Sequence, residues 1–216
     1  MEWNRPELKR KTGILLSDVR TLSDMSQLNS GFKLQDILRP TCPTHESAIK
    51  SAISVAVQLT GLSKSLLSRL PAKLDTIVTA NEDELKQSNR NMVPLSAAEW
   101  SKVLLTKVIA QTVLTHDYPM SSPNSVTKSL VGSLLLLDDV TNYLNEIEEV
   151  KLIKSLKSSG AATLITSKRW AIGRFADRIV ILKNGAVVES GTHSELIEKG
   201  RHNSVYASHW AQMMSS

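Results

Sequence analysis

Two adjacent carboxylates follow an unbroken run of leucines in the second half of the chain. The run covers residues 134–137, and Asp138 and Asp139 come directly after it. An apolar run of this length is typical of a buried strand, and acidic side chains at its end could bind Mg²⁺, which prefers oxygen ligands. A purely structural interpretation is also open, because aspartates can end a strand and cap the next helix. The residues around the pair must decide between the two.

The elements predicted around the acidic pair alternate between strands and helices. Strands are predicted at 14–16, 133–137 and 161–166, and a helix over 145–160 connects the last two. The Asn184-Gly185 pair predicts a β-hairpin within 177–191. A short helix before this hairpin, at 169–175, and one after it, at 193–200, complete the series. This alternation predicts an α/β fold with parallel strands whose faces are covered.

The middle of the chain is predicted to be helical. A helix over 44–71 is interrupted at Gly61, and Thr44 or Ser47 could cap its start. A second helix covers 97–114, where the apolar spacing is that of a helix packed in a core. Ser96 precedes it, and Glu99 follows three residues later, which predicts a capping box. The polar segments 79–91 and 115–132 are predicted to be loops.

In this order of elements, and in the residues at their joints, the chain resembles the nucleotide-binding (ATPase) domain of ABC transporters of the exporter type. The strongest likeness covers 161–196, where TSKRWAIGRFADRI and ESGTHSEL resemble the family's switch region and its last motif. LLLLDDVTNYLNEIEE resembles the Walker B strand and D-loop. LSAAEW stands at the signature motif, and residues 3–22 resemble the segment that enters the Q-loop. The resemblance implies a partial P-loop NTPase core with an inserted α-helical subdomain.

The resemblance also implies a division of the chain into three parts. Residues 1–31 would be a remnant of the N-terminal core and the Q-loop region. Residues 32–115 would form the helical subdomain with the signature-like motif, and 116–216 the C-terminal α/β half with the Walker B-like, D-loop-like and switch regions. The sequence would then begin just after the place of the family's phosphate loop.

That phosphate loop, G-x-x-x-x-G-K-[ST], does not occur in the sequence. None of the nine glycines is followed by lysine, and no two have the required spacing. The loop's backbone N–H groups and lysine cradle the phosphates of a bound nucleotide. The 216 residues therefore lack the principal phosphate-binding element.

Of three further positions at which the family contacts nucleotide or metal, one has the expected residue and two have unusual residues. Asp138 stands at the place of the Mg²⁺-binding aspartate. Asp139 stands where the family has a glutamate that polarises water, and its shorter carboxylate would be displaced by ~1 Å, which can lower a rate by about 10²-fold. Lys168 stands at the place of the switch histidine and can contact phosphate only as a point charge. A solvated lysine at a strand end is the structural alternative for Lys168.

The signature-like motif has changed in a similar way. It retains a serine, but alanines replace both glycines, their Cβ atoms hinder a close approach to phosphate, and a glutamate that adds negative charge replaces the glutamine. The five residues of the motif are Leu95, Ser96, Ala97, Ala98 and Glu99. Asn145 stands at the D-loop aspartate, and Ser17 or Asp18 at the Q-loop glutamine. For Ser96 the structural alternative is a helix cap with no nucleotide contact.

Composition narrows the possible partners. The single Cys42 excludes an internal disulfide and suits a reducing compartment. The net charge of +5 is dispersed, so no nucleic-acid partner is expected. No apolar run approaches the ~20 residues that cross a bilayer, so a membrane would be reached only through a partner. We expect a cytoplasmic protein, with peripheral binding at the inner face of a membrane as one option.

Together these observations predict a degenerate ABC exporter domain that is not an enzyme by itself. It would be a non-catalytic or complementing partner of another nucleotide-binding domain or of a transmembrane export subunit. ATP and Mg²⁺ would bind only where a partner completes the site. Two alternatives stay open, a non-transport interaction protein that reuses the scaffold and one half of a split ATPase. An incomplete sheet would expose an edge, so self-association or an obligate partner is expected.

Overall fold

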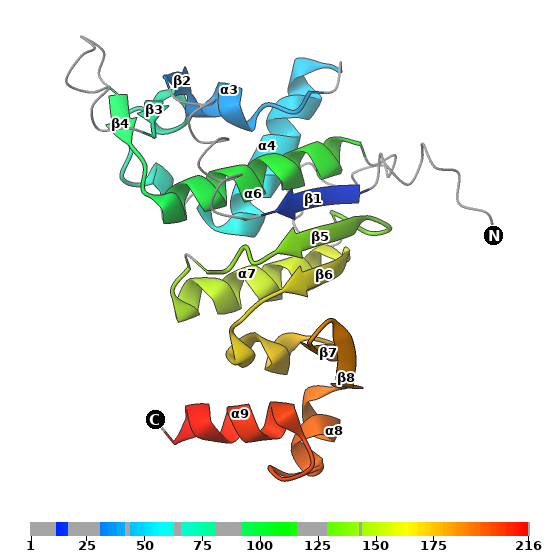
Figure 1. The fold of residues 1–216 in the computed structure, drawn as a ribbon. Helices are drawn as coiled ribbons and strands as arrows, with labels where there is room; N and C mark the ends of the chain where they lie inside the picture. Colours follow the sequence, from blue (N-terminus) through cyan, green and yellow to red (C-terminus); the bar gives the residue numbers. More distant parts are fainter. Residues whose placement is uncertain are drawn as a thin grey trace. The chain divides into compact units, whose positions relative to one another are not determined.

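The computed structural model describes residues 12–16, 31–41, 44–62, 66–80, 92–115, 129–142 and 144–215 (Figure 1). Contacts divide the chain into a first unit, Met1–Thr166, and a second unit, Ser167–Ser216. The three-part division implied by the resemblance was drawn from motifs rather than contacts and stays a prediction.

The leucine run forms the central strand of a three-stranded parallel sheet in the first unit. The strands are β1 (Thr12–Leu16), β5 (Leu134–Asp138) and β6 (Ala162–Thr166), in the order β1-β5-β6, and Figure 1 shows them side by side. Both pairings are parallel, and Asp138 lies in register with Thr166. The predicted parallel strands are therefore confirmed, and all three end at the same edge of the sheet.

Helix α7 (Glu146–Ser159) is the crossover connection between β5 and β6. Asn145 caps its start, where the side chain accepts a hydrogen bond from the Glu148 N–H at 2.9 Å. Gly160 ends it in the left-handed conformation, with φ of 79°, which glycine adopts without a Cβ penalty. The predicted limits of this helix are confirmed at both ends.

Three more helices build most of the core of the first unit. They are α3 (Leu34–Leu38), α4 (Glu46–Thr60) and α6 (Ala97–Leu114). Helix α4 packs against both α6 and α7, and α6 packs against β1. Trp100 and Ile109 of α6 are buried, at 2% and 0% exposed. The N-cap of α4 is His45, with no side-chain hydrogen bond, so the predicted cap at Thr44 or Ser47 was wrong.

A small second sheet in the first unit was not predicted. It contains β2 (Phe32–Lys33), β3 (Ile77–Thr79) and β4 (Met92–Pro94) in that order, and the 3₁₀ helix η2 (Lys73–Asp75) precedes β3. Thr79 was predicted to begin an exposed loop, but it is fully buried at the end of β3. Most of that predicted loop, 81–91, lies outside the described residues.

The second unit is a hairpin with short helices around a small core. It contains the 3₁₀ helix η3 (Trp170–Phe175), β7 (Ile179–Lys183), β8 (Ala186–Gly191), α8 (His193–Glu198) and α9 (Val205–Met214). The hairpin turns at Asn184 and Gly185, both with positive φ, which confirms the prediction. Tyr206 of α9, 1% exposed, packs with Leu196 and Ile179, although α9 itself was not predicted.

Along the ranges that the structure describes, we find no helix that combines the length and apolar character of a membrane span.

Candidate functional site

The acidic pair lies at the edge where the parallel strands end. The hydroxyl of Thr166, at the end of β6, donates a hydrogen bond to the Asp138 carboxylate. The Asp139 N–H lies 3.1 Å from both the carbonyl oxygen and the Oγ1 of Thr166. In open α/β sheets, ligands bind outside this carboxyl edge. Asp138, Asp139 and Thr166 therefore form one polar cluster at the edge that such folds use for binding.

Asp139 also begins the turn that leads from β5 to α7. Its φ of 53° is in the left-handed region, which aspartate and asparagine tolerate better than most residues. The side-chain amide of Asn142 donates to the Asp139 carboxylate, and the Asn142 N–H lies 3.3 Å from the Asp139 carbonyl. The carboxylate placed where a catalytic glutamate is expected thus takes part in closing a turn.

The cluster supplies only part of a magnesium–nucleotide site. Mg²⁺ is usually held by one or two carboxylates together with water and substrate phosphates, and Asp138 and Asp139 could provide that protein share. Among the described residues there is no group of three or more His, Cys, Asp or Glu side chains that could hold a metal ion. The sequence also has no phosphate loop. The residues present therefore do not fit Mg-ATP without additional phosphate ligands.

Ser96 of the signature-like motif is the N-cap of α6. Its Oγ donates to Glu99 Oε2 at 2.9 Å and accepts from the Glu99 N–H at 3.3 Å, while the Ser96 N–H donates to the same carboxylate at 2.9 Å. The predicted capping box is confirmed. Leu95 is buried at 6% exposed, whereas Ala97 and Ala98 lie in the first turn of the helix.

Glu99 has a second partner in Arg69. The Arg69 Nε and Nη2 atoms lie 3.1 and 2.6 Å from Glu99 Oε1. Burial alone would raise the pKa of Glu99, but the hydrogen bonds from Ser96 and Arg69 together lower it below its ordinary value. An ionised carboxylate therefore lies at the N-terminus of α6, where the helix dipole and free N–H groups would otherwise favour an external anion.

Asn145, at the D-loop-like position, is connected to α6 through α7. Its backbone N–H and side chain complete a capping box with Glu148. The other carboxylate oxygen of Glu148 forms an ion pair with Lys102 of α6, whose side chain is only 10% exposed. The D-loop-like turn is thereby linked to the helix that begins with the signature-like motif.

The remaining predicted site residues lie elsewhere. Lys168 belongs to the second unit, where its side chain is exposed. Ser17 and Asp18, at the place of the Q-loop glutamine, lie outside the described residues. Sequence reasoning did not single out Thr166, Arg69 or Lys102. Only Thr166 had a usable signal, since it ends a strand predicted to be parallel to the one that ends in Asp138.

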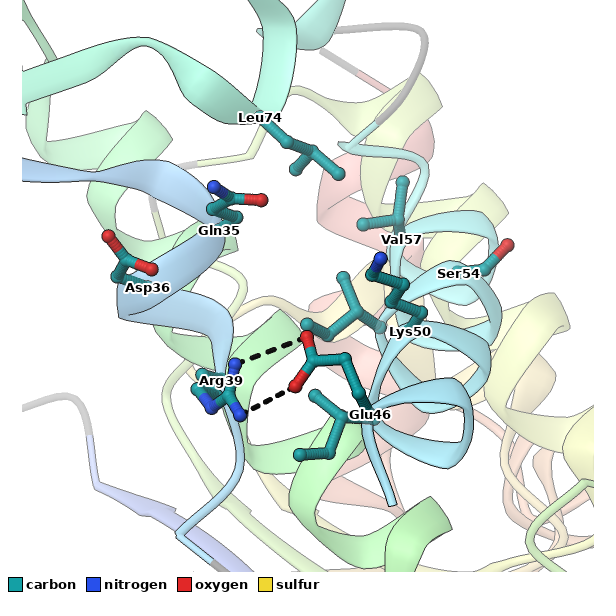
Figure 2. Close-up of a pocket in the computed structure, with 10 residues that line it drawn as sticks. Gln35, Asp36, Arg39, Glu46, Lys50, Ser54, Val57 and Leu74 are labelled. Carbon is teal, nitrogen blue, oxygen red and sulfur yellow. Dashed lines mark hydrogen bonds and ion pairs between the residues drawn. The ribbon is translucent and has the colours of Figure 1, made fainter. Parts of the chain in front are cut away.

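A hollow between α3 and α4 is a separate feature of the first unit (Figure 2). Ile49, Ile53 and Val57 of α4 contribute apolar side chains to it. Figure 2 shows Arg39 and Glu46 facing each other at its rim, with Nη2–Oε2 and Nη1–Oε1 distances of 2.7 and 3.2 Å. Both side chains are about half exposed, so this bidentate pair contributes only modestly to stability.

Several proteins of known family are similar to the chain, although no family model matches it. An uncharacterized ABC transporter ATP-binding protein of Bacillus subtilis, YfiC, is 27% identical over 89% of this chain and 29% of its own length. The ATP-dependent lipid A-core flippase of Alkalilimnicola ehrlichii is 25% identical over 96% of this chain and 28% of its own length. A β-(1→2)glucan export ATP-binding/permease protein, NdvA, of Bradyrhizobium diazoefficiens is 41% identical over 36% of this chain and 14% of its own length.

The fold has a counterpart among solved structures. A bacterial Atm1-family ABC exporter with ATP bound superposes with a TM-score of 0.60 and 19% identity, over 95% of this chain and 28% of that chain. The chain thus spans less than a third of the length of each of these proteins. The alternating elements, the parallel sheet that ends in Asp138 and these similarities agree. The chain is related to the ATPase domain of exporter-type ABC transporters.

Proposed function

We propose that these 216 residues do not bind or hydrolyse ATP by themselves and that they act as a non-catalytic or complementing partner in ATP-driven export. The partner would be another nucleotide-binding domain or a transmembrane export subunit. ATP and Mg²⁺ would be bound only in that complex. Such a role places the protein at the cytoplasmic face of a membrane, held there by its partner.

The Ser96–Glu99–Arg69 network is the observation that carries this proposal. The serine that would face a nucleotide phosphate uses its hydroxyl as both donor and acceptor within the cap. The neighbouring carboxylate is kept ionised by the same network and would repel a phosphate. In addition, the sequence contains no G-x-x-x-x-G-K-[ST] loop to hold the other side of the nucleotide. Each feature disfavours nucleotide binding by the chain alone.

Isothermal titration calorimetry with Mg-ATP tests the proposal directly. We expect no binding heat from the purified chain at millimolar nucleotide, and binding when a partner ATPase domain is added. A matched variant, Glu99→Gln, removes the carboxylate charge and keeps most of the cap. It should still not bind alone, since the phosphate loop is missing. Turnover or micromolar binding by the unmodified chain alone would refute the proposal.

Two alternatives differ from this proposal in the partner that they require. An interaction protein outside transport would bind its partner equally well with and without nucleotide. One half of a split ATPase would gain nucleotide binding only from a segment that carries a phosphate loop. The partner-free edge strand of the described parallel sheet favours the split-ATPase alternative as a second candidate function.

A further inference from the structure

The 3₁₀ helix η3 of the second unit is longer than most helices of its type. It covers the six residues Trp170–Phe175. Runs of more than three or four residues are uncommon in 3₁₀ helices, because their hydrogen-bond geometry is poorer than that of an α-helix. The conformation of η3 therefore depends on its contacts with other elements of the unit.

Helix α9 supplies such contacts along one side of η3. The ring of Trp170 lies against that of His209, with the two centroids 4.2 Å apart. Gly173 lies so close to Tyr206 that an added Cβ would be 2.5 Å from the phenol oxygen. Residues three apart lie above one another on a 3₁₀ helix, so Trp170 and Gly173 belong to the same side. This side of η3 is held by α9.

Helix α9 is itself fixed mainly at its first turn. The Tyr206 N–H donates a hydrogen bond to the nearly buried Glu189 carboxylate of β8 at 3.1 Å. The Tyr206 hydroxyl lies 2.9 Å from His193 Nδ1 of α8. At the other end of the helix, Met213 and Met214 are 39% and 69% exposed. The later turns of α9 can therefore separate from η3 while the first turn stays in place.

The residues before η3 form a turn that continues directly into it. The Arg169 N–H donates to Ser167 Oγ at 3.0 Å, which closes a serine turn with Lys168 at its middle. We call residues 167–169 the Lys168 turn. Trp170 follows at once, so this turn ends where the contact with His209 begins. The backbone around Lys168 thus depends on how η3 is held.

We propose that α9 is a clasp that holds η3 in its 3₁₀ conformation and thereby sets the backbone of the Lys168 turn. Tyr206 and His209 are the positioning residues of this clasp. When the later turns of α9 separate from η3, the 3₁₀ helix loses the contacts that stabilise it, and the Lys168 turn can change its conformation. The bearing of the clasp on nucleotide binding, through Lys168, rests on the proposed function.

Amide hydrogen exchange of the full chain, read by NMR, tests the clasp. His209→Ala removes the ring beside Trp170 without weakening α9, because alanine favours a helix more than histidine does. The amides of 171–175 should exchange about two- to tenfold faster, the range for loss of one aromatic contact, and the resonances of the Lys168 turn should shift. Exchange in β7 and β8 should stay the same. Met213→Ala, one turn further along α9, is the matched control and should change neither.

A double-mutant cycle assigns the effect to the contact between the two rings. Trp170→Leu should also accelerate exchange in η3, and His209→Ala should add little to it. His209→Phe keeps a ring at the same place and should restore slow exchange. Circular dichroism checks that each variant is folded. Unchanged exchange of η3 in both His209→Ala and Trp170→Leu would overturn the clasp. Equal acceleration in η3, β7 and β8 would indicate a general loss of stability and would also overturn it.

Calorimetry with Mg-ATP and a partner ATPase domain separates the clasp from the proposed function. His209→Ala and Lys168→Ala should both weaken nucleotide binding by the complex, but only His209→Ala should accelerate exchange in η3. Faster exchange with unchanged nucleotide binding would overturn the role of the clasp in placing Lys168 and leave the proposed function intact. Absence of nucleotide binding by the complex of the unmodified chain would overturn the proposed function, and the exchange measurements would still decide the clasp.

Discussion

Ser96 and Glu99, at places where the resemblance implies contact with a ligand, both take part in the cap of α6. In the signature-like motif both side chains are engaged in one cap, and Arg69 fixes the carboxylate from another part of the chain. Asp138 and Asp139 are similar, since Thr166 and Asn142 donate to them. A carboxylate with such donors is oriented and ionised, but its oxygens are less available to an external ligand. Position in a motif therefore does not establish a role in binding.

Changing Glu99 to glutamine should lower stability in a pH-dependent way. The folded-state pKa of Glu99 is lowered because its hydrogen bonds from Ser96 and Arg69 outweigh the effect of burial, which raises it. Its stabilisation is thus fully present above the ordinary pKa of 4.5 and is lost as pH falls through the lowered folded value. We expect Glu99→Gln to cost about 0.5–1 kcal/mol at neutral pH, an amount limited by solvent screening.

Urea unfolding followed by circular dichroism, at neutral pH and in acid, measures this difference. The difference in unfolding free energy between Glu99→Gln and the unmodified chain should become smaller as the pH falls. Asp36→Asn is a control on the exposed side of α3, and its effect at neutral pH should be smaller. A difference in unfolding free energy that grows in acid would contradict the assignment of Glu99 as an ionised carboxylate.

The elements that sequence could predict are those with a strong local signal. Leucines before Asp138 predicted β5, Gly160 predicted the end of α7, and Asn184-Gly185 predicted the hairpin. The sheet of β2, β3 and β4 was missed because strands of two or three residues show no periodicity. Helix α9 was also missed, although the serine before it, Ser204, could have indicated a helix start. In the structure Ser204 Oγ accepts a hydrogen bond from the Ala207 N–H at 3.0 Å.

In the candidate site, too, features with a local sequence signal could be predicted and contacts between distant residues could not. Asp138 and the Ser96–Glu99 cap follow from local patterns, whereas the ion pairs of Glu99 with Arg69 and of Lys102 with Glu148 join residues far apart in the sequence. Such pairs depend on how helices pack, and no single-sequence pattern encodes that packing.

The ion pair between α6 and α7 should be a major contact between these elements. Lys102 is nearly buried, so Glu148→Ala would leave its charge without this partner and should destabilise the first unit by about 2–4 kcal/mol. Replacing both residues, as Lys102→Met with Glu148→Ala, removes the buried charge and should recover much of the loss.

Thermal or urea denaturation of Glu148→Ala, Lys102→Met and the double variant completes this double-mutant cycle. Glu198→Ala, an exposed residue of α8, is the control and should change stability by no more than about 0.5 kcal/mol. Equal destabilisation by the single and the double variant would show that the charge on Lys102 is not the cause.

At the scale of the whole molecule, the chain has two units with separate cores. The first unit is built on the parallel sheet and three longer helices, and the second on Tyr206 and its aromatic neighbours. Tyr206 Oη is 2.9 Å from His193 Nδ1, and the ring of Trp210 stacks beside that of Tyr206. A change inside one core should therefore act mainly on the unit that contains it.

Gly173→Ala should destabilise the second unit selectively. A Cβ at Gly173 would lie 2.5 Å from Tyr206 Oη and 2.9 Å from its ring, and Tyr206 is too deeply buried to move freely. We expect a loss of about 1–3 kcal/mol from this overpacking. Amide hydrogen exchange should show faster exchange in β7, β8 and α9 and little change in α7. Ser194→Ala, on the exposed start of α8, should have no such effect, and uniform acceleration in both units would contradict the prediction.

The sheet order β1-β5-β6 has a consequence for the sequence of events during folding. Strands β5 and β6 and helix α7 are contiguous in the sequence, so they can form from local contacts. Thr12 of β1 pairs with Leu134, and most of the sequence of the first unit lies between these two residues. Closing so long a loop is entropically costly and slow. The β5–α7–β6 segment should therefore form before β1 arrives, leaving both of its edges open to other chains at the ribosome or chaperone. A partner present during synthesis would then meet the free β6 edge before the unit is complete.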